Sequence, residues 1–246
     1  MYTLKTKSSI TTLVLLSFLI ALPNIVSAAE GWKGDIGVGY NQSNGNTEKS
    51  SLSVAGHVKR IFEHSDFMLK GDIYMSTTDE RLDDQKWSGL ASSNFDIDDA
   101  GKWFTSFGVL IDHDRFADID VRITPSAGIG YWFLDEDDIK LNVEGALGYE
   151  STSYRSGIPD EDGVVALGKV FFEKQIFEKA RIAEHITVIP SLEGGGFRVK
   201  SETEFTNPLR DDLDLSVKYV VDHNSEPAAG KKKTDTRIVT GVKYSF

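Results

Sequence analysis

The sequence contains no cysteine, which excludes structural disulfides and a lipid-modified amino-terminal cysteine. It is also poor in basic residues, with 27 Lys and Arg against 38 Asp and Glu and a formal net charge of −11. This balance argues against a nucleic-acid partner, because such proteins present a basic surface. Beyond the amino terminus, no hydrophobic run approaches the roughly 20 residues of a membrane-spanning helix.

The amino terminus has the pattern of a targeting signal. Lys5 and Lys7 precede an apolar run from Leu13 to Leu22, and small residues follow at Ser27 and Ala28. This order of charged, apolar and small residues predicts a secretory signal peptide at residues 1–28 and export through the periplasm. The mature domain is then 29–246. An uncleaved membrane anchor is the alternative, but the apolar run is short for one.

The last twelve residues, DTRIVTGVKYSF, alternate strictly between two environments. Ile238 and Val242 fall on one face of the expected strand, whereas Arg237 and Lys243 fall on the other. Such alternation is typical of a barrel strand with lipid on one side and a polar lumen on the other. Tyr244 and the terminal Phe246 also form the insertion signal that we expect the bacterial barrel-assembly machinery to recognise.

Twelve stretches with period-two alternation predict an all-β fold, a transmembrane antiparallel β-barrel of about 12 strands in the bacterial outer membrane. The expected strands are 32–41, 47–60, 67–75, 87–97, 103–111, 121–133, 139–149, 163–174, 182–192, 197–205, 213–221 and 235–246. The eighth is apolar on both faces, so its register stays open. A soluble β-sandwich is the alternative, but several of these stretches are longer than ordinary strands.

The connections are expected to alternate between short periplasmic turns and longer surface loops at 76–85, 112–120, 151–162 and 223–234. These loops hold clusters of acidic residues: Asp79, Glu80, Asp83, Asp84, Asp112, Asp114, Asp118, Asp120, Asp160, Glu161 and Asp162. A run of charges is usually a solvated surface. Binding of divalent cations such as Ca²⁺ or Mg²⁺ is the alternative, because clustered carboxylates suit hard cations.

The polar face of the strands predicts a charged lumen. The candidate lumen charges are Lys33, Asp35, Lys70, Asp72, Arg122, Glu144, Arg198, Glu202, Arg237 and Lys243. They could form a ladder of ion pairs that fills the barrel, or they could line a polar channel that selects solutes. A barrel of twelve strands is wider than those filled by side chains and narrower than the large porins, which favours a narrow or partly occluded pore.

One enzymatic interpretation is possible for this sequence. Asp112, His113 and Asp114, with Asp83 and Asp84 on a neighbouring loop, superficially resemble the acid–histidine pairs of the omptin surface proteases. A surface hydrolase built on the Asp112–His113 loop is therefore the alternative to a non-enzymatic barrel. Omptins have ten strands, however, and no zinc-ligand spacing or phosphate-binding glycine motif is present. We therefore expect no enzyme activity, no catalytic residue, no metal centre and no cofactor.

Both ends of the mature chain resemble one family. The opening hairpin WKGDIGVGYNQSNGNTEKSSLSV (Trp32–Val54), the segment Ser191–Phe205 and the final Tyr244–Phe246 carry the resemblance to the YdiY-like, salt-induced outer-membrane proteins. The resemblance implies a barrel of unknown function that contacts outer-membrane lipid and lipopolysaccharide, with a link to salt or osmotic stress. The resemblance supplies no catalytic residues, and the leading hypothesis for this barrel is a narrow channel or an envelope-structural protein.

Overall fold

The computed structural model of the chain describes residues 31–43, 48–157, 159–194, 196–227 and 230–246. The predicted signal peptide at residues 1–28 lies outside these residues. Among the residues described, no helix is long and apolar enough to cross a membrane.

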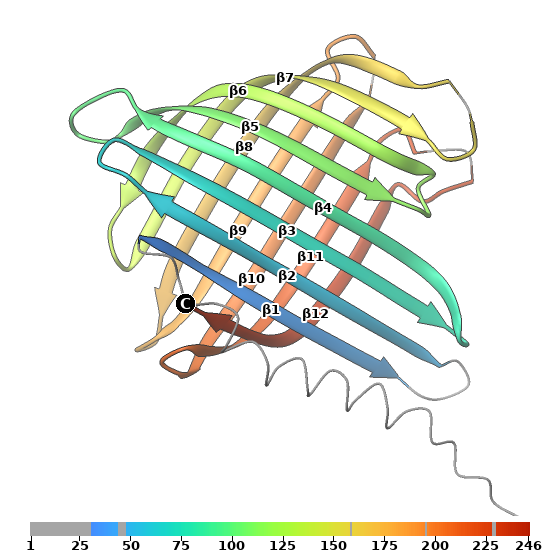
Figure 1. Cartoon of the computed structure of the whole chain (residues 1–246), viewed down its shortest axis with the longest axis horizontal. Helices are drawn as coiled ribbons and strands as arrows, with labels where there is room; N and C mark the ends of the chain where they lie inside the picture. Colours follow the sequence, from blue (N-terminus) through green and yellow to red (C-terminus); the bar gives the residue numbers. More distant parts are fainter. Residues whose placement is uncertain (1–30, 44–47, 158, 195, 228–229) are drawn as a thin grey trace, which may run out of the picture.

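The described chain folds into twelve antiparallel strands that close on themselves (Figure 1). The strands are β1 (Trp32–Ser43), β2 (Lys49–Ile61), β3 (Ser65–Thr78), β4 (Arg81–Asp96), β5 (Trp103–Asp114), β6 (Ile119–Asp135), β7 (Ile139–Tyr154), β8 (Glu161–Ile176), β9 (Ala180–Pro190), β10 (Phe197–Arg210), β11 (Leu213–Asn224) and β12 (Thr234–Ser245). Each strand pairs with its neighbours in sequence, and β1 pairs with β12. The predicted all-β, twelve-stranded antiparallel barrel is confirmed.

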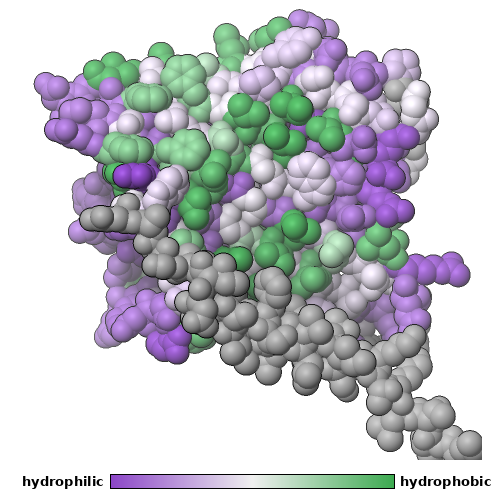
Figure 2. Space-filling model, in the orientation of Figure 1, coloured by the Kyte–Doolittle hydropathy of each residue, from purple (hydrophilic) through white to green (hydrophobic). Residues whose placement is uncertain are grey.

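Alternation along the strands separates an apolar outer face from a polar inner one. Large hydrophobic side chains that remain exposed include Tyr40, Leu69, Ile73, Trp103, Phe107, Ile129, Phe133, Leu147, Tyr149, Tyr219 and Ile238. Hydrophobic residues gather over the middle of the face seen in Figure 2, and hydrophilic residues lie towards its two ends. A barrel that spans a bilayer has this distribution, because its outer band contacts lipid while its rims contact water.

Several strands extend beyond their predicted ends. The expected loop 76–85 is mostly strand, and only Asp79 and Glu80 form the turn, with φ of 49° and 63°. Likewise β5 continues to Asp114 and β7 to Tyr154. Hydrophobic alternation marks only the lipid-facing part of a strand, so the polar extensions were wrongly assigned to loops. Hydrogen bonds hold one such extension, where Ser76 and Thr78 both donate to Asp83.

The contact between β1 and β12 closes the barrel. The two strands are in register at five positions, from Asp35↔Ser245 to Gly39↔Gly241. Gly34 and Phe246 extend the seam, because each backbone N–H donates to the carbonyl of the other at 3.0 Å. The strands approach closely here, since a Cβ added at Gly241 would overlap the Val38 carbonyl oxygen.

We therefore predict that Gly241→Ala weakens barrel closure. The added methyl group would force β12 away from β1 and break part of the seam. The folded fraction after refolding into detergent, measured by heat-modifiable mobility on gels, should fall clearly. Gly145→Ala is the matched control, because a Cβ there meets nothing within 4 Å. Equal folding of the two variants would show that the seam tolerates a side chain.

Candidate functional site

The inner face of the barrel carries an ion-pair network, which is the candidate site. Asp35 lies 3.1 Å from His57 and 3.4 Å from Lys243, and Lys243 also lies 3.3 Å from Glu204. The other predicted lumen charges have these partners: Asp72 accepts from Ser88, Arg122 and Arg198 contact Glu150, Glu144 contacts Lys169, and Arg237 contacts Asp222. Lys33 is exposed and sits opposite Lys59 in register. The network thus continues around the inner wall.

Some ion pairs cross the bore rather than follow the wall. Lys70 on β3 reaches Glu202 on β10, with Nζ and Oε2 2.9 Å apart. Strands β2, β1, β12 and β11 lie between them on the shorter way round the barrel. Because the two strands are not neighbours, the side chains must meet inside the barrel. Lys86 on β4 similarly reaches Asp235 on β12 at 3.4 Å. These contacts constrict the bore.

Three lysines surround the carboxylate of Glu202. Besides Lys70, Lys200 lies 3.7 Å and Lys218 3.9 Å from its oxygens. Glu202 is 7 % exposed and is one of the few buried charged residues that the structure describes. A carboxylate so deeply enclosed needs charged partners, because burial removes its hydration. Glu202 is therefore the centre of the constriction.

One stretch of the inner wall is apolar. Ala146, Val165, Leu167 and Ile189 form a buried cluster on β7, β8 and β9. This resolves the register of the eighth strand, whose two apolar faces contact lipid outside and this cluster inside. Beside the cluster, the rings of Phe171 and His185 lie 4.7 Å apart. Glu144 and Lys169 form an ion pair on β7 and β8, so the cluster interrupts the charged inner wall only locally.

The charged side of the bore remains in contact with solvent. The side chains of Lys200 and Lys70 are 33 % and 31 % exposed, and that of Asp222 is 31 % exposed. His185 is exposed, although it faces inward and pairs in register with Glu202. Among the described residues, the one buried side-chain polar atom without a hydrogen-bond partner is Asp84 Oδ1. The interior is therefore wet rather than packed dry.

The predicted acidic clusters take part in strand contacts. Asp84, Asp114 and Asp235 surround Lys86, with separations between 3.1 and 3.7 Å. Tyr154 donates to Glu161 at 2.6 Å. No group of three or more His, Asp or Glu side chains in the described ranges is arranged to hold a metal ion. Lys86 occupies the centre of the cluster formed by Asp84, Asp114 and Asp235.

The Asp112–His113 arrangement differs from the predicted one. Both residues lie within β5, and alternation places them on opposite sides of the wall. Asp112 is opposite Arg122 in register, whereas His113 stacks on Trp87 with ring centroids 5.5 Å apart. The His113 Nδ1 atom contacts the Asp120 carbonyl at 2.7 Å. Asp112 therefore does not orient His113, and this pair does not form the acid–histidine dyad on which the alternative, a surface hydrolase, depends.

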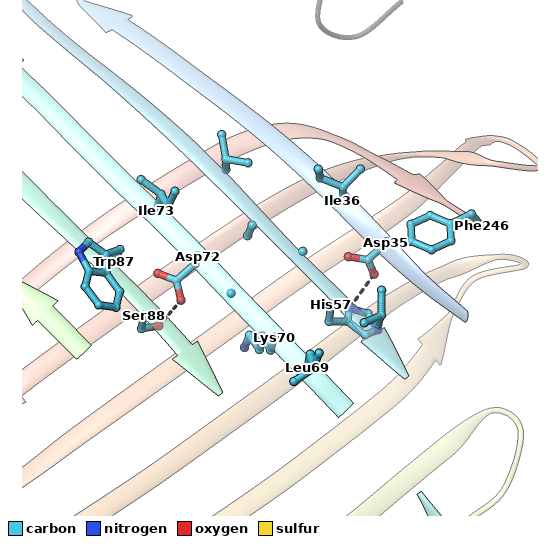
Figure 3. A pocket seen from close by; sticks show the side chains of 15 residues that line it. Asp35, Ile36, His57, Leu69, Lys70, Asp72, Ile73, Trp87, Ser88 and Phe246 are labelled. Carbon is cyan, nitrogen blue, oxygen red and sulfur yellow. Dashed lines mark hydrogen bonds and ion pairs between the residues drawn. The ribbon is translucent and has the colours of Figure 1, made fainter. Parts of the chain in front are cut away.

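The wall also has a hollow where glycines of two strands meet. Gly56 of β2 and Gly71 of β3 are paired in register, and together they line a cavity of about 610 Å³. Figure 3 shows Asp35 bonded to His57 and Asp72 bonded to Ser88 beside the cavity. Lys70 lies on β3, next to Gly71. The barrel wall is therefore thin beside Lys70, whose side chain crosses the bore.

The predicted insertion signal lies at the seam. Tyr244 pairs in register with Ile36 of β1, and the rings of Tyr244 and Phe246 lie 6.5 Å apart. The Phe246 ring would lie 3.0 Å from a Cβ at Gly34, so this glycine makes room for it. The terminal residues are therefore part of the wall itself.

Several functional residues were missed at the level of sequence. Asp222, Lys169 and His57 are partners in the network but were not predicted as lumen charges. Asp222 lies near the end of β11 and Lys169 lies on the strand with uncertain register. His57 already lies on the inward face of its predicted strand, and extending the eleventh strand to its polar end would have placed Asp222 there too.

Residues 36–246 match the family described as "Protein of unknown function, DUF481". The chain belongs to this family. A curated relative is the uncharacterized protein YdiY of Escherichia coli K12, which is 22 % identical over 231 residues, spanning 94 % of this chain and 89 % of YdiY. The predicted YdiY-like membership is therefore confirmed.

Solved barrels resemble the structure of this family member. The NanC porin aligns with a TM-score of 0.53 and 12 % identity over 87 % of this chain and 100 % of the porin. The KdgM porin aligns with a TM-score of 0.46 and 14 % identity over 87 % of this chain and 99 % of that one. At these identities the NanC likeness shows the fold alone, that of a porin-type β-barrel.

The wet and dry parts of the interior can be separated by chemical labelling. We predict that a cysteine introduced as His185→Cys reacts with a charged, water-soluble thiol reagent, because His185 contacts bore solvent. Leu167→Cys, which lies in the buried cluster, should react at least about tenfold more slowly. The chain has no native cysteine to interfere. Equal labelling rates would contradict a solvent-filled bore beside a dry apolar cluster.

Proposed function

We propose that this DUF481 protein is an outer-membrane channel for small solutes, with a narrow, hydrated bore constricted at Glu202. The observation that carries the proposal is the partial exposure of charged side chains that meet across the interior. Lys70 and Lys200 contact Glu202 yet keep about a third of their surface in solvent. A purely structural barrel would gain by filling this space with packed side chains, as the Leu167 side already does.

The location and partners are part of the same proposal. The apolar outer band supports contact with outer-membrane lipid and lipopolysaccharide, and the seam residues Tyr244 and Phe246 support recognition by the barrel-assembly machinery. An association with salt or osmotic stress would follow if the bore carries small osmolytes or ions. Transcript and growth measurements at high salt, with and without the gene, would test that association.

The channel is tested by single-channel recording in planar bilayers. The refolded barrel should give discrete conductance steps in potassium chloride. Failure to record steps, with barrel insertion verified by protease protection, would overturn the channel and leave an envelope-structural role.

We predict that Lys70→Ala raises the conductance, roughly twofold, because it removes the side chain that crosses the bore. Lys59→Ala is the matched control. Lys59 pairs with Asp66 on the adjacent strand at 3.1 Å, so its side chain stays at the wall. A similar conductance for both variants would show that the Lys70–Glu202 contact does not limit ion flow.

A further inference from the structure

The surroundings of Glu202 form an anion site that the protein itself occupies. Three ammonium groups from three strands, Lys70 of β3, Lys200 of β10 and Lys218 of β11, lie 2.9 to 3.9 Å from one carboxylate. Each lysine remains partly exposed, at 31 %, 33 % and 20 %. Solvent in the bore therefore reaches part of each lysine side chain.

Neighbouring carboxylates have closer partners of their own, although Lys218 also lies opposite Glu204 in register. Asp222 is held by Arg237 at 2.5 Å, and Glu204 by Ser216 at 2.7 Å and Lys243 at 3.3 Å. Glu202 is therefore the carboxylate that the three lysines share. Replacing it with another carboxylate would leave the charge balance of the bore unchanged.

We propose that Lys70, Lys200 and Lys218 form a binding site for the carboxylate of a small organic anion, and that Glu202 occupies this site when the solute is absent. The proposal rests on the channel function in one respect, because the solute reaches the site through the bore. Exchange of one carboxylate for another lowers the free-energy cost of moving the solute through the bore, because the solute gains the contacts that Glu202 gives up.

The surrounding charges favour a singly charged solute group. The carboxylates of Asp72, Asp112 and Asp222 interact electrostatically with the ammonium group of Lys200. They would repel a dianion more strongly than a monoanion. The cations are also lysines, whose ammonium groups act as point charges, rather than the arginine forks that match phosphate geometry. A carboxylate therefore fits better than a phosphate group.

The site can be tested without measuring conduction. Glu202→Ala removes the internal carboxylate, and acetate added to the refolded barrel should take its place. We expect the thermal midpoint of this variant to rise by about 2–4 °C in sodium acetate relative to equal sodium chloride, because the ligand binds the folded state alone. The wild-type protein, whose site is filled, should show no acetate-specific rise. Glu204→Ala is the matched control, because Glu204 lies on the same strand but pairs with Lys243 and Ser216. Acetate should have no specific effect on this variant.

The proposed site would be overturned if acetate did not raise the thermal midpoint of Glu202→Ala, or if it raised that of Glu204→Ala equally. If Glu202→Ala does not refold, Glu202→Gln keeps the shape and removes the charge. In a potassium chloride gradient its reversal potential should move towards the chloride equilibrium potential, with anion permeability rising roughly threefold over Glu204→Gln. Equal reversal potentials in these two conducting variants would also overturn it. If the wild-type protein gives no conductance steps but Glu202→Ala still binds acetate, the proposed channel fails and the proposed anion site stands.

Discussion

The pairing of β1 with β12 is the contact on which the rest of this structure depends. Backbone groups in a bilayer must be paired within the protein, so a sheet can span it only when no edge remains open. Here the seam is short, and Gly39, Gly241 and the Gly34–Phe246 backbone pair allow its strands to approach closely. Closure then creates two separate environments: an outer surface that contacts lipid and an inner space whose charges must find partners inside.

That enclosure explains why the lumen contains so many ion pairs and why some cross it. A charge on an open sheet could be solvated freely, but an enclosed one loses part of its hydration and needs an opposite charge nearby. Neighbouring strands supply many partners, as in Asp35 with His57. Where they do not, long side chains reach across, as Lys70 does to Glu202. The constriction is thus a consequence of charge pairing in a confined space.

Local alternation predicted the barrel and its strand number, and it named Lys70 and Glu202 as candidate lumen charges, because each inference depends on residues close together in sequence. It failed where that signal weakens. Val165 and Leu167 face inward although they are apolar, so the register of β8 stayed open, and the polar end of β5 was assigned to a loop. The Lys70–Glu202 contact was beyond prediction for another reason. Its partners are 132 residues apart, and only the curvature of the closed wall brings them together.

The division of the interior gives the constriction its chemical character. The buried cluster around Leu167 covers one stretch of the inner wall, whereas ion pairs such as Lys70–Glu202 and Glu144–Lys169 occupy the rest. In the channel that we propose, a solute would meet positive and negative groups that are already paired with one another. Free charges of one sign would hold a counter-ion tightly and slow its release, whereas paired charges allow binding only by exchange. A bore of this kind would admit solutes that can replace an internal partner, and Glu202, shared by three lysines, is the partner best placed to be replaced.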